Sequence, residues 1–157
     1  MVAAPSGGQS SCVVRQFEEA IPLFERTLAD RERILGETHP DTLASRNNLA
    51  RAYRDAGRAD EAIPLFEPTL ADRERVLGGT HPDTLTSRNN LACAYQDAGR
   101  LDETIPLFEH TLADRERVLG ETHRSTLASR TNLAAAYQAA GRVDDAETLR
   151  NRTEPRS

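Results

Sequence analysis

The sequence predicts an all-α protein built from repeated pairs of antiparallel helices, and three observations support this. Residues 39–80 and 81–122 align without a gap over 42 positions and differ at only seven of them. Each segment contains two stretches with apolar residues at helical spacing, separated by turns that contain glycine. Charged residues make up 29% of the chain and aromatic residues 4%, a balance that suits exposed helices better than sheets.

The repeat also sets the organisation of the whole chain. In order, we expect a leader or improvised N-terminal cap at 1–15, a half repeat with a second helix only at 16–38, full repeats at 39–80 and 81–122, a truncated and polar capping repeat at 123–152, and a tail at 153–157. The half repeat leaves three alternatives open. Residues 9–15 improvise a cap, the chain is a piece of a longer array, or this end self-associates.

Each full repeat contains its own helix start and stop signals. We expect the first helix over about 40–56 and the second over about 60–77. Thr38 precedes an aspartate by three residues, which is the spacing of a capping box. Gly57 and Gly78 are expected to end the two helices in the left-handed conformation.

Composition excludes several classes of function. The net charge of −5 and the isoelectric point of about 5.4 argue against a nucleic-acid binder. Cys12 and Cys93 lie in unrelated contexts, so a disulfide framework or zinc site is not expected and a reducing, cytoplasmic location fits better. No apolar run approaches the length of a membrane span, and no signal peptide is recognisable. All 20 basic residues are Arg, a bias typical of GC-rich bacterial coding.

No catalytic, metal or cofactor site is predicted. His39, His81 and His123 occur once per repeat, which spaces them apart instead of bringing them together on a metal, so we expect them at helix starts. Neither a phosphate-binding loop nor a nucleophile elbow occurs. We therefore expect a chain that is not an enzyme.

The residues that recur within each repeat resemble a known family. The pattern is Leu49-Ala50-x-x-Tyr53-x-x-x-Gly57-x-x-x-x-Ala62-x-x-x-Phe66. It resembles the tetratricopeptide repeat (TPR), and the 42-residue period is similar to the kinesin-light-chain variety of that repeat. The resemblance covers roughly residues 16–150 and departs at Ala59, Leu101 and Val143, where the common form has an aromatic residue. It implies a right-handed α-solenoid, a TPR-like superhelix whose first helices line a concave groove.

One face of the first helix varies between the repeats while the core positions stay fixed. The first-helix differences between the two full repeats are Ala44/Thr86, Arg51/Cys93 and Arg54/Gln96, and they fall within about 80° of arc on the polar side of that helix. Contact with a non-repetitive partner would explain this variation, and neutral drift on a solvated face is the alternative. The candidate groove residues are Ala44, Asn47, Asn48, Arg51, Arg54, Thr86, Asn89, Asn90, Cys93, Gln96, Thr131, Asn132 and Gln138.

Paired asparagines flank the variable stripe. A side-chain amide both donates and accepts hydrogen bonds, so it can bind the backbone of an extended peptide. The resemblance to kinesin-light-chain repeats implies this role for the asparagines. In the alternative, one asparagine of each pair bonds a helix of the neighbouring repeat.

Charge adds a prediction about the partner. The first-helix segments of the three repeats sum to a charge of +5, whereas the second-helix segments of the two full repeats carry −3 and −4. An acidic or C-terminal peptide segment therefore suits the groove. Arg46, Arg88 and Arg130 lie on the packing side and are expected either to extend their charged ends to solvent or to pair with acids of the second helices, and not to bind the ligand. The ADRER segments are expected to be solvated faces with local ion pairs.

Taken together, the sequence predicts a non-catalytic module that binds a partner peptide in the groove. The alternative is a structural spacer or self-association element of a larger signalling protein, acting through the half repeat. No cofactor, nucleic acid or membrane is expected as a partner.

Overall fold

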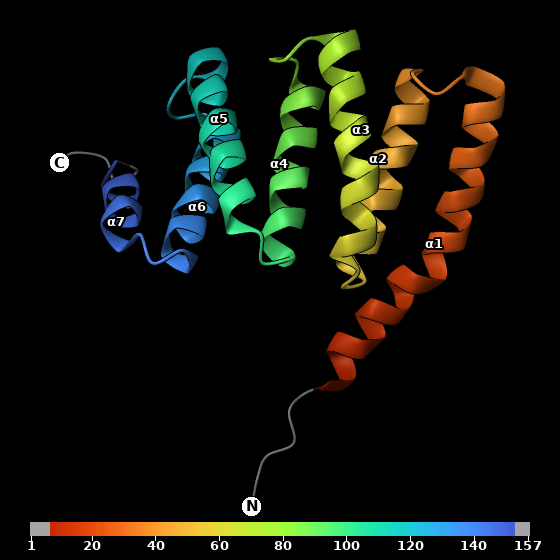
Figure 1. Ribbon diagram of the computed structural model, residues 1–157, viewed down its shortest axis with the longest axis horizontal. Helices are drawn as coiled ribbons and strands as arrows, with labels where there is room; N and C mark the ends of the chain where they lie inside the picture. Colours follow the sequence, from red (N-terminus) through yellow and green to blue (C-terminus); the bar gives the residue numbers. More distant parts are fainter. Residues whose placement is uncertain (1–6, 153–157) are drawn as a thin grey trace, which may run out of the picture. The chain divides into compact units, whose positions relative to one another are not determined.

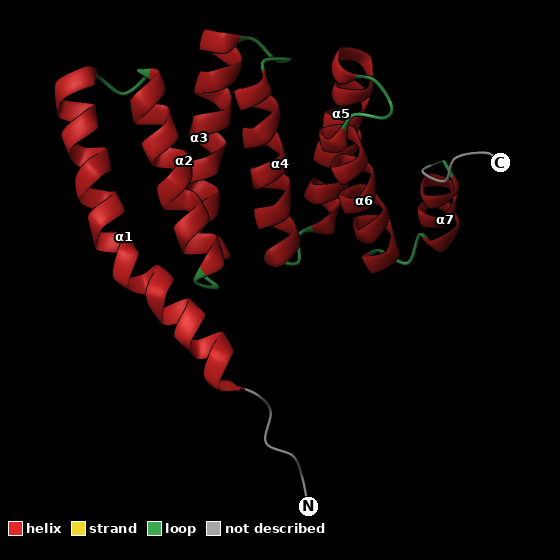
Figure 2. Cartoon of the chain, turned by 180° about the vertical axis from the view of Figure 1, so that it is seen from behind, coloured by secondary structure: helices red, strands yellow, loops and turns green. Residues whose placement is uncertain are grey.

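The computed structural model describes the backbone of residues 7–152 and the side chains of residues 12–152, and every regular element in that span is a helix (Figures 1 and 2). The elements are α1 (Gly7–Leu35), α2 (Pro40–Asp55), α3 (Ala59–Leu77), α4 (Pro82–Asp97), α5 (Leu101–Leu119), α6 (Arg124–Ala139) and α7 (Val143–Asn151). The chain forms two compact units that meet within α3, the first ending at Asp72 and the second starting at Arg73. Each unit is described by itself.

In the first unit, α1 packs against α2. Ile21 and Leu28 of α1 are buried against Leu49, Ala52 and Ala56 of α2. The apolar residues of the half repeat therefore have a partner, because they pack forward onto the first helix that follows them. Residues 9–15 are part of the same continuous helix, α1, with no turn between them and the half repeat.

In the second unit, α5 packs against both α4 and α6, and α7 packs against α6. Phe108 of α5 and Ala136 of α6 are fully buried at its centre. Helix α7 has nine residues against 19 in α5, which is the shortened last helix that the sequence predicts. Its buried residues are Ala146 and Leu149.

Histidine begins each first helix. The Nδ1 atoms of His39, His81 and His123 each accept a hydrogen bond, 3.1 Å long, from the backbone N–H two residues later. This confirms the expected helix-start role of the histidines. The predicted capping box at Thr38 is wrong, because the capping residue is His39, one position further along.

Glycine ends the helices as predicted. Gly57, Gly78 and Gly99 have φ values of 79°, 93° and 76°. A residue with a side chain is strained in this left-handed region, so glycine is the residue that closes these turns without cost.

A comparison of two glycines in the second unit tests this constraint. We expect Gly99→Ala to lower the free energy of unfolding by about 1–2 kcal/mol because its φ is positive. Gly79 has no positive φ, and an added Cβ would lie 3.9 Å from Arg88, an ordinary contact. Gly79→Ala is therefore the matched control and is expected to change stability by less than about 1 kcal/mol in urea unfolding. Equal losses in both variants would contradict the explanation.

One set of arginines bonds acids of the second helices, as the sequence predicts. Arg46 on α2 donates from Nη1 to Asp72 on α3, with an N–O distance of 3.1 Å, and its Nη2 lies 3.8 Å from Glu32 on α1. Arg88 on α4 donates to Asp114 on α5 at 2.7 Å, and its side chain is 3% exposed. Each guanidinium in this set therefore fastens a first helix to an acidic second helix.

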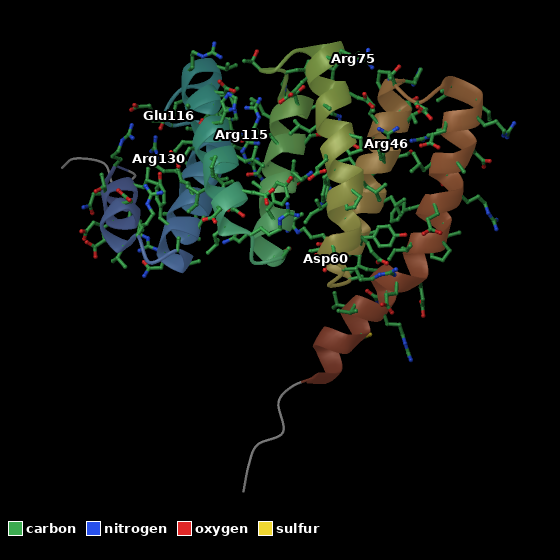
Figure 3. All side chains as sticks on the ribbon, viewed as in Figure 1. Arg46, Asp60, Arg75, Arg115, Glu116 and Arg130 are labelled. Carbon is green, nitrogen blue, oxygen red and sulfur yellow. The ribbon has the colours of Figure 1, made fainter. Side chains whose placement is uncertain are left out.

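A second set of arginines corrects the prediction that the ADRER segments are solvated. Arg73 and Arg115 are buried, and each donates to a serine hydroxyl of the following first helix, Ser87 at 2.7 Å and Ser129 at 2.6 Å. Arg31 makes the equivalent bond to Ser45 at 2.6 Å. Burial lowers the pKa of Arg73 and Arg115. These side chains join consecutive helices instead of forming local surface pairs (Figure 3).

The carboxylate of Asp114 provides a pH test of this packing. Partial burial would raise its pKa, but hydrogen bonds from Arg88 and Arg117, together with the nearby His110, outweigh it and hold the pKa of Asp114 below its ordinary value. Because the folded-state pKa is depressed, the stabilisation is present above the unfolded-state pKa and is lost as the pH falls through the folded-state pKa.

We therefore expect Asp114→Asn to cost about 2 kcal/mol at pH 7 and to weaken the loss of stability in acid, measured by urea unfolding between pH 2.5 and 7. Asp102→Asn, on the exposed start of the same helix, is the control. If both variants keep the same pH dependence as the parent chain, Asp114 does not carry the effect.

Candidate protein-interaction site

The first unit contains a hollow of about 330 Å³ between α1 and α2. We call it the α1–α2 hollow, and its lining residues are Phe17, Phe24, Asn48, Arg51, Ala52 and Asp55. The two phenylalanine rings are half-buried and rest on the core of this unit. The hollow therefore has an apolar base and a polar rim.

The rim is formed by three exposed side chains of α2, spaced so that they share one face of the helix. Asn48, Arg51 and Asp55 are all exposed. Within the part of the chain that the structure describes, none of the three makes a side-chain hydrogen bond or ion pair. The rim thus offers an amide, a guanidinium and a carboxylate to a ligand without first breaking an internal bond.

The other candidate residues of α2 are less accessible. Asn47 is buried, with 7% of its surface exposed, and Ala44 and Arg54 are half-buried. Both Asn47 and Arg54 interact with other residues. Of the two adjacent asparagines, only Asn48 faces the α1–α2 hollow.

In the second unit, asparagines bond one another across repeats. Asn132 on α6 donates from Nδ2 to Oδ1 of Asn89 on α4, at 3.3 Å. The Asn89 amide in turn donates to Sγ of Cys93 at 3.9 Å. The bond between Asn132 and Asn89 is the contact between repeats that the alternative describes. Together with the contact to Cys93, it uses both polar atoms of the Asn89 amide.

The remaining candidates of the second unit differ in exposure. Thr86 on α4 and Thr131 and Gln138 on α6 are exposed, whereas Asn90 and Gln96 are half-buried. Thr131 and Gln138 are accordingly the accessible ones among the candidate residues of α6.

Four lining residues of the α1–α2 hollow were not among the predicted groove residues, namely Phe17, Phe24, Ala52 and Asp55. The spacing of seven between Phe17 and Phe24 places both on one face of α1, which is a signal that the sequence contains. Asp55 lies only about 20° from Ala44 around the helix, so the same wheel could have included it.

Other kinds of site find no support among residues 12–152. No three side chains of His, Cys, Asp or Glu gather there in an arrangement that could hold a metal ion. No helix in the described part of the chain is both long and apolar enough to pass through a bilayer. The two cysteines are free thiols, with Cys12 exposed and Cys93 half-buried.

Comparison with known proteins agrees with this fold. One tetratricopeptide repeat model matches residues 8–67 and 47–103, and another matches residues 84–125 and 126–149. The chain therefore belongs to the tetratricopeptide repeat family, and its fold is an all-α solenoid of helical repeats. No protein among the curated sequences gives a match.

Solved structures indicate the variety of repeat. A Podosopora anserina protein assigned as a kinesin light chain, with nearly identical TPR-like repeats, is 38% identical to this chain with a TM-score of 0.81. That match covers 90% of this chain and 68% of the other, and a point variant of the same protein matches at 36% identity with the same coverage and TM-score. BtubC (BKLC) from P. vanneervenii shares the fold at 22% identity with a TM-score of 0.73; the match covers 90% of this chain and 61% of BtubC. The predicted kinesin-light-chain-like repeat type is confirmed.

The amide pair on α4 and α6 can be tested by a double-mutant cycle. Asn89→Ala and Asn132→Ala remove the two ends of one hydrogen bond, so the double variant should lose less stability than the sum of the single variants, by about 1 kcal/mol. Asn89→Ala combined with Gln138→Ala is the control pair and should be additive. Additive losses for both pairs would show that the Asn89–Asn132 bond contributes nothing to stability.

Proposed function

We propose that this chain is a non-catalytic module that binds a segment of a partner protein on the exposed polar face of its first helices, with the α1–α2 hollow as an anchoring site. Tetratricopeptide repeats generally mediate protein–protein interaction, and such repeats are typically scaffolds and not enzymes. The observation that carries the proposal is the meeting of unbonded Asn48 and Arg51 with two phenylalanine rings in one hollow.

The chemistry of the α1–α2 hollow suits an extended peptide. An apolar side chain of the partner can rest on Phe17 and Phe24, which removes apolar surface from water. The amide of Asn48 can bond the peptide backbone whatever its sequence. The guanidinium of Arg51 can donate two parallel hydrogen bonds to a carboxylate. This favours a partner with an acidic residue or a C-terminal carboxylate beside the apolar side chain.

Two features of the sequence agree with this partner. The first-helix segments are net positive in a protein with a net charge of −5. Arg51 is replaced by Cys93 and Ala135 in the other repeats, so its charge does not serve the repeat architecture itself. We place the module in a reducing, cytoplasmic compartment because its two cysteines lie in unrelated sequence contexts that do not suit a disulfide framework.

A peptide-display selection tests the anchoring site. Selected peptides should carry an apolar residue next to an acidic residue or a free C-terminus. Asn48→Ala and Arg51→Ala should each weaken the binding of the selected peptide about tenfold, measured by calorimetric titration, because each removes a group that can form a hydrogen bond with the ligand. The fold should be retained, since Ala135 occupies the Arg51 position in the third repeat.

Arg26→Ala is the matched control, because Arg26 is an exposed arginine of α1 that does not line the α1–α2 hollow. Undiminished binding by both hollow variants would remove the hollow from the binding site. An equal loss in the control would show that only net charge matters.

Self-association is a second candidate, supported by the outer face of α1. Leu23 is 65% exposed, whereas its repeat equivalents Leu65 and Leu107 are half-buried against the cores of their units. A second copy of the chain could cover this face. Leu23→Asp should then abolish any concentration-dependent increase in mass measured by light scattering, and a mass that is independent of concentration in the parent chain would rule the candidate out.

A further inference from the structure

A second hollow, of about 140 Å³, lies between α6 and α7 in the other compact unit. We call it the α6–α7 hollow, and it is lined by Arg130, Thr131, Ala134, Ala135 and Arg150. Two of these five residues carry a guanidinium, and none is acidic. The α6–α7 hollow shares no residue with the α1–α2 hollow.

The chain itself shows what binds an arginine at the position of Arg130. The equivalent arginines of the two full repeats donate from Nη1 to an aspartate of the following second helix, Arg46 to Asp72 at 3.1 Å and Arg88 to Asp114 at 2.7 Å. In the sequence alignment of the repeats, the residue one repeat after Asp114 is Arg156, which carries no carboxylate.

Among the described residues, Arg130 contacts one acid, whereas Arg46 and Arg88 each contact two. Its Nη2 donates to Glu116 on α5 at 3.0 Å. Among residues 12–152 its Nε is buried without a hydrogen-bond partner, although the residue is only 3% exposed. A buried N–H without a partner is unfavourable, and a ligand that accepts its hydrogen bond would remove that penalty.

Arg150 leaves open volume in the α6–α7 hollow and adds a positive charge to its border. It stands where Phe66 and Phe108 stand in the full repeats, and those rings are completely buried. Arg150 is exposed and donates to Gln138 at 3.4 Å, so the volume of the ring is left open and a second guanidinium borders it.

The surrounding charges favour an anion. Arg152 lies 3.7 Å from Glu116 and 3.8 Å from Glu121, so among the described residues two acids lie near the three guanidinium groups of Arg130, Arg150 and Arg152. The volume of about 140 Å³ exceeds that of a few waters at about 30 Å³ each, which is sufficient for a carboxylate on its short stem.

We propose that the α6–α7 hollow binds the side-chain carboxylate of an Asp or Glu on a partner protein, the kind of group that Arg46 and Arg88 bond within the full repeats. The carboxylate accepts hydrogen bonds from Nε of Arg130 and from the guanidinium of Arg150. This inference rests on the chain being a protein-binding module, but it does not depend on the α1–α2 hollow.

The probe is an acetylated and amidated pentapeptide, Ala-Ala-Asp-Ala-Ala, which carries a single carboxylate. NMR of the arginine Nε–H groups of the full chain reads out the buried N–H directly. The Asp peptide should shift the Arg130 Nε–H signal in a saturable manner, and the matching Asn peptide should do so at least about tenfold more weakly, because the charged acceptor gives the stronger bond.

Variants locate the effect without removing the buried arginine. Arg150→Gln should weaken binding of the Asp peptide about tenfold, whereas Arg124→Gln, which removes an exposed charge from the same helix as Arg130, should change it less than about twofold. Arg51→Ala in the α1–α2 hollow should leave this binding unchanged, which separates the two sites.

Several results would overturn the proposal. They are an Arg130 signal that does not move, equal binding of the Asp and Asn peptides, equal losses for Arg150→Gln and Arg124→Gln, and tighter binding of inorganic phosphate than of the Asp peptide. The last result would assign the α6–α7 hollow to phosphate instead of a side-chain carboxylate.

Discussion

The pairing of buried arginines with groups on neighbouring helices is the constraint on which the rest of this structure depends. A chain with four phenylalanines and no tryptophan has little aromatic volume for its core, so specificity of packing has to come from polar groups as well. Arg88 meets an acid of the helix on either side, Glu74 and Asp114. A buried charge is tolerated only with partners, so Arg88 requires an acid on each of the two helices that flank it.

The same pairing of polar groups across helices explains the polar contacts at the two ends of each first helix. Arg73 and Arg115 bond serines at the start of the following first helix, and Thr84 and Thr126 return a hydroxyl bond to the backbone carbonyls of those arginines at 3.3 Å. Tyr95 covers the opposite end of the first helix, where Arg100 lies 4.6 Å from its ring centre. Polar contacts thus mark both ends of a core made mostly of Leu and Ala.

Most of the fold could be predicted from the sequence, because periodicity, glycine and proline report directly on where a helix starts and stops. The burial of Arg73 could not be predicted from the sequence, since an ion-pair pattern within one helix looks the same whether or not the next helix covers it. The difference in burial between Asn47 and Asn48 could not be predicted either. Two adjacent residues lie 100° apart around the helix, and packing alone decides which of them is covered. The α1–α2 hollow required knowing that α1 packs forward onto α2.

The near identity of the two full repeats has a consequence for how the chain folds. Every first helix presents the same Ser and Arg to its neighbours, so Arg73 would find an equally suitable serine at Ser45 or Ser129 as at Ser87. The seven positions that differ between the two full repeats include neither this serine nor this arginine, so these contacts do not distinguish a native pairing from a shifted one. Correct order must come from chain connectivity and short turns, which makes exchange of helices between two molecules the characteristic error of such an array.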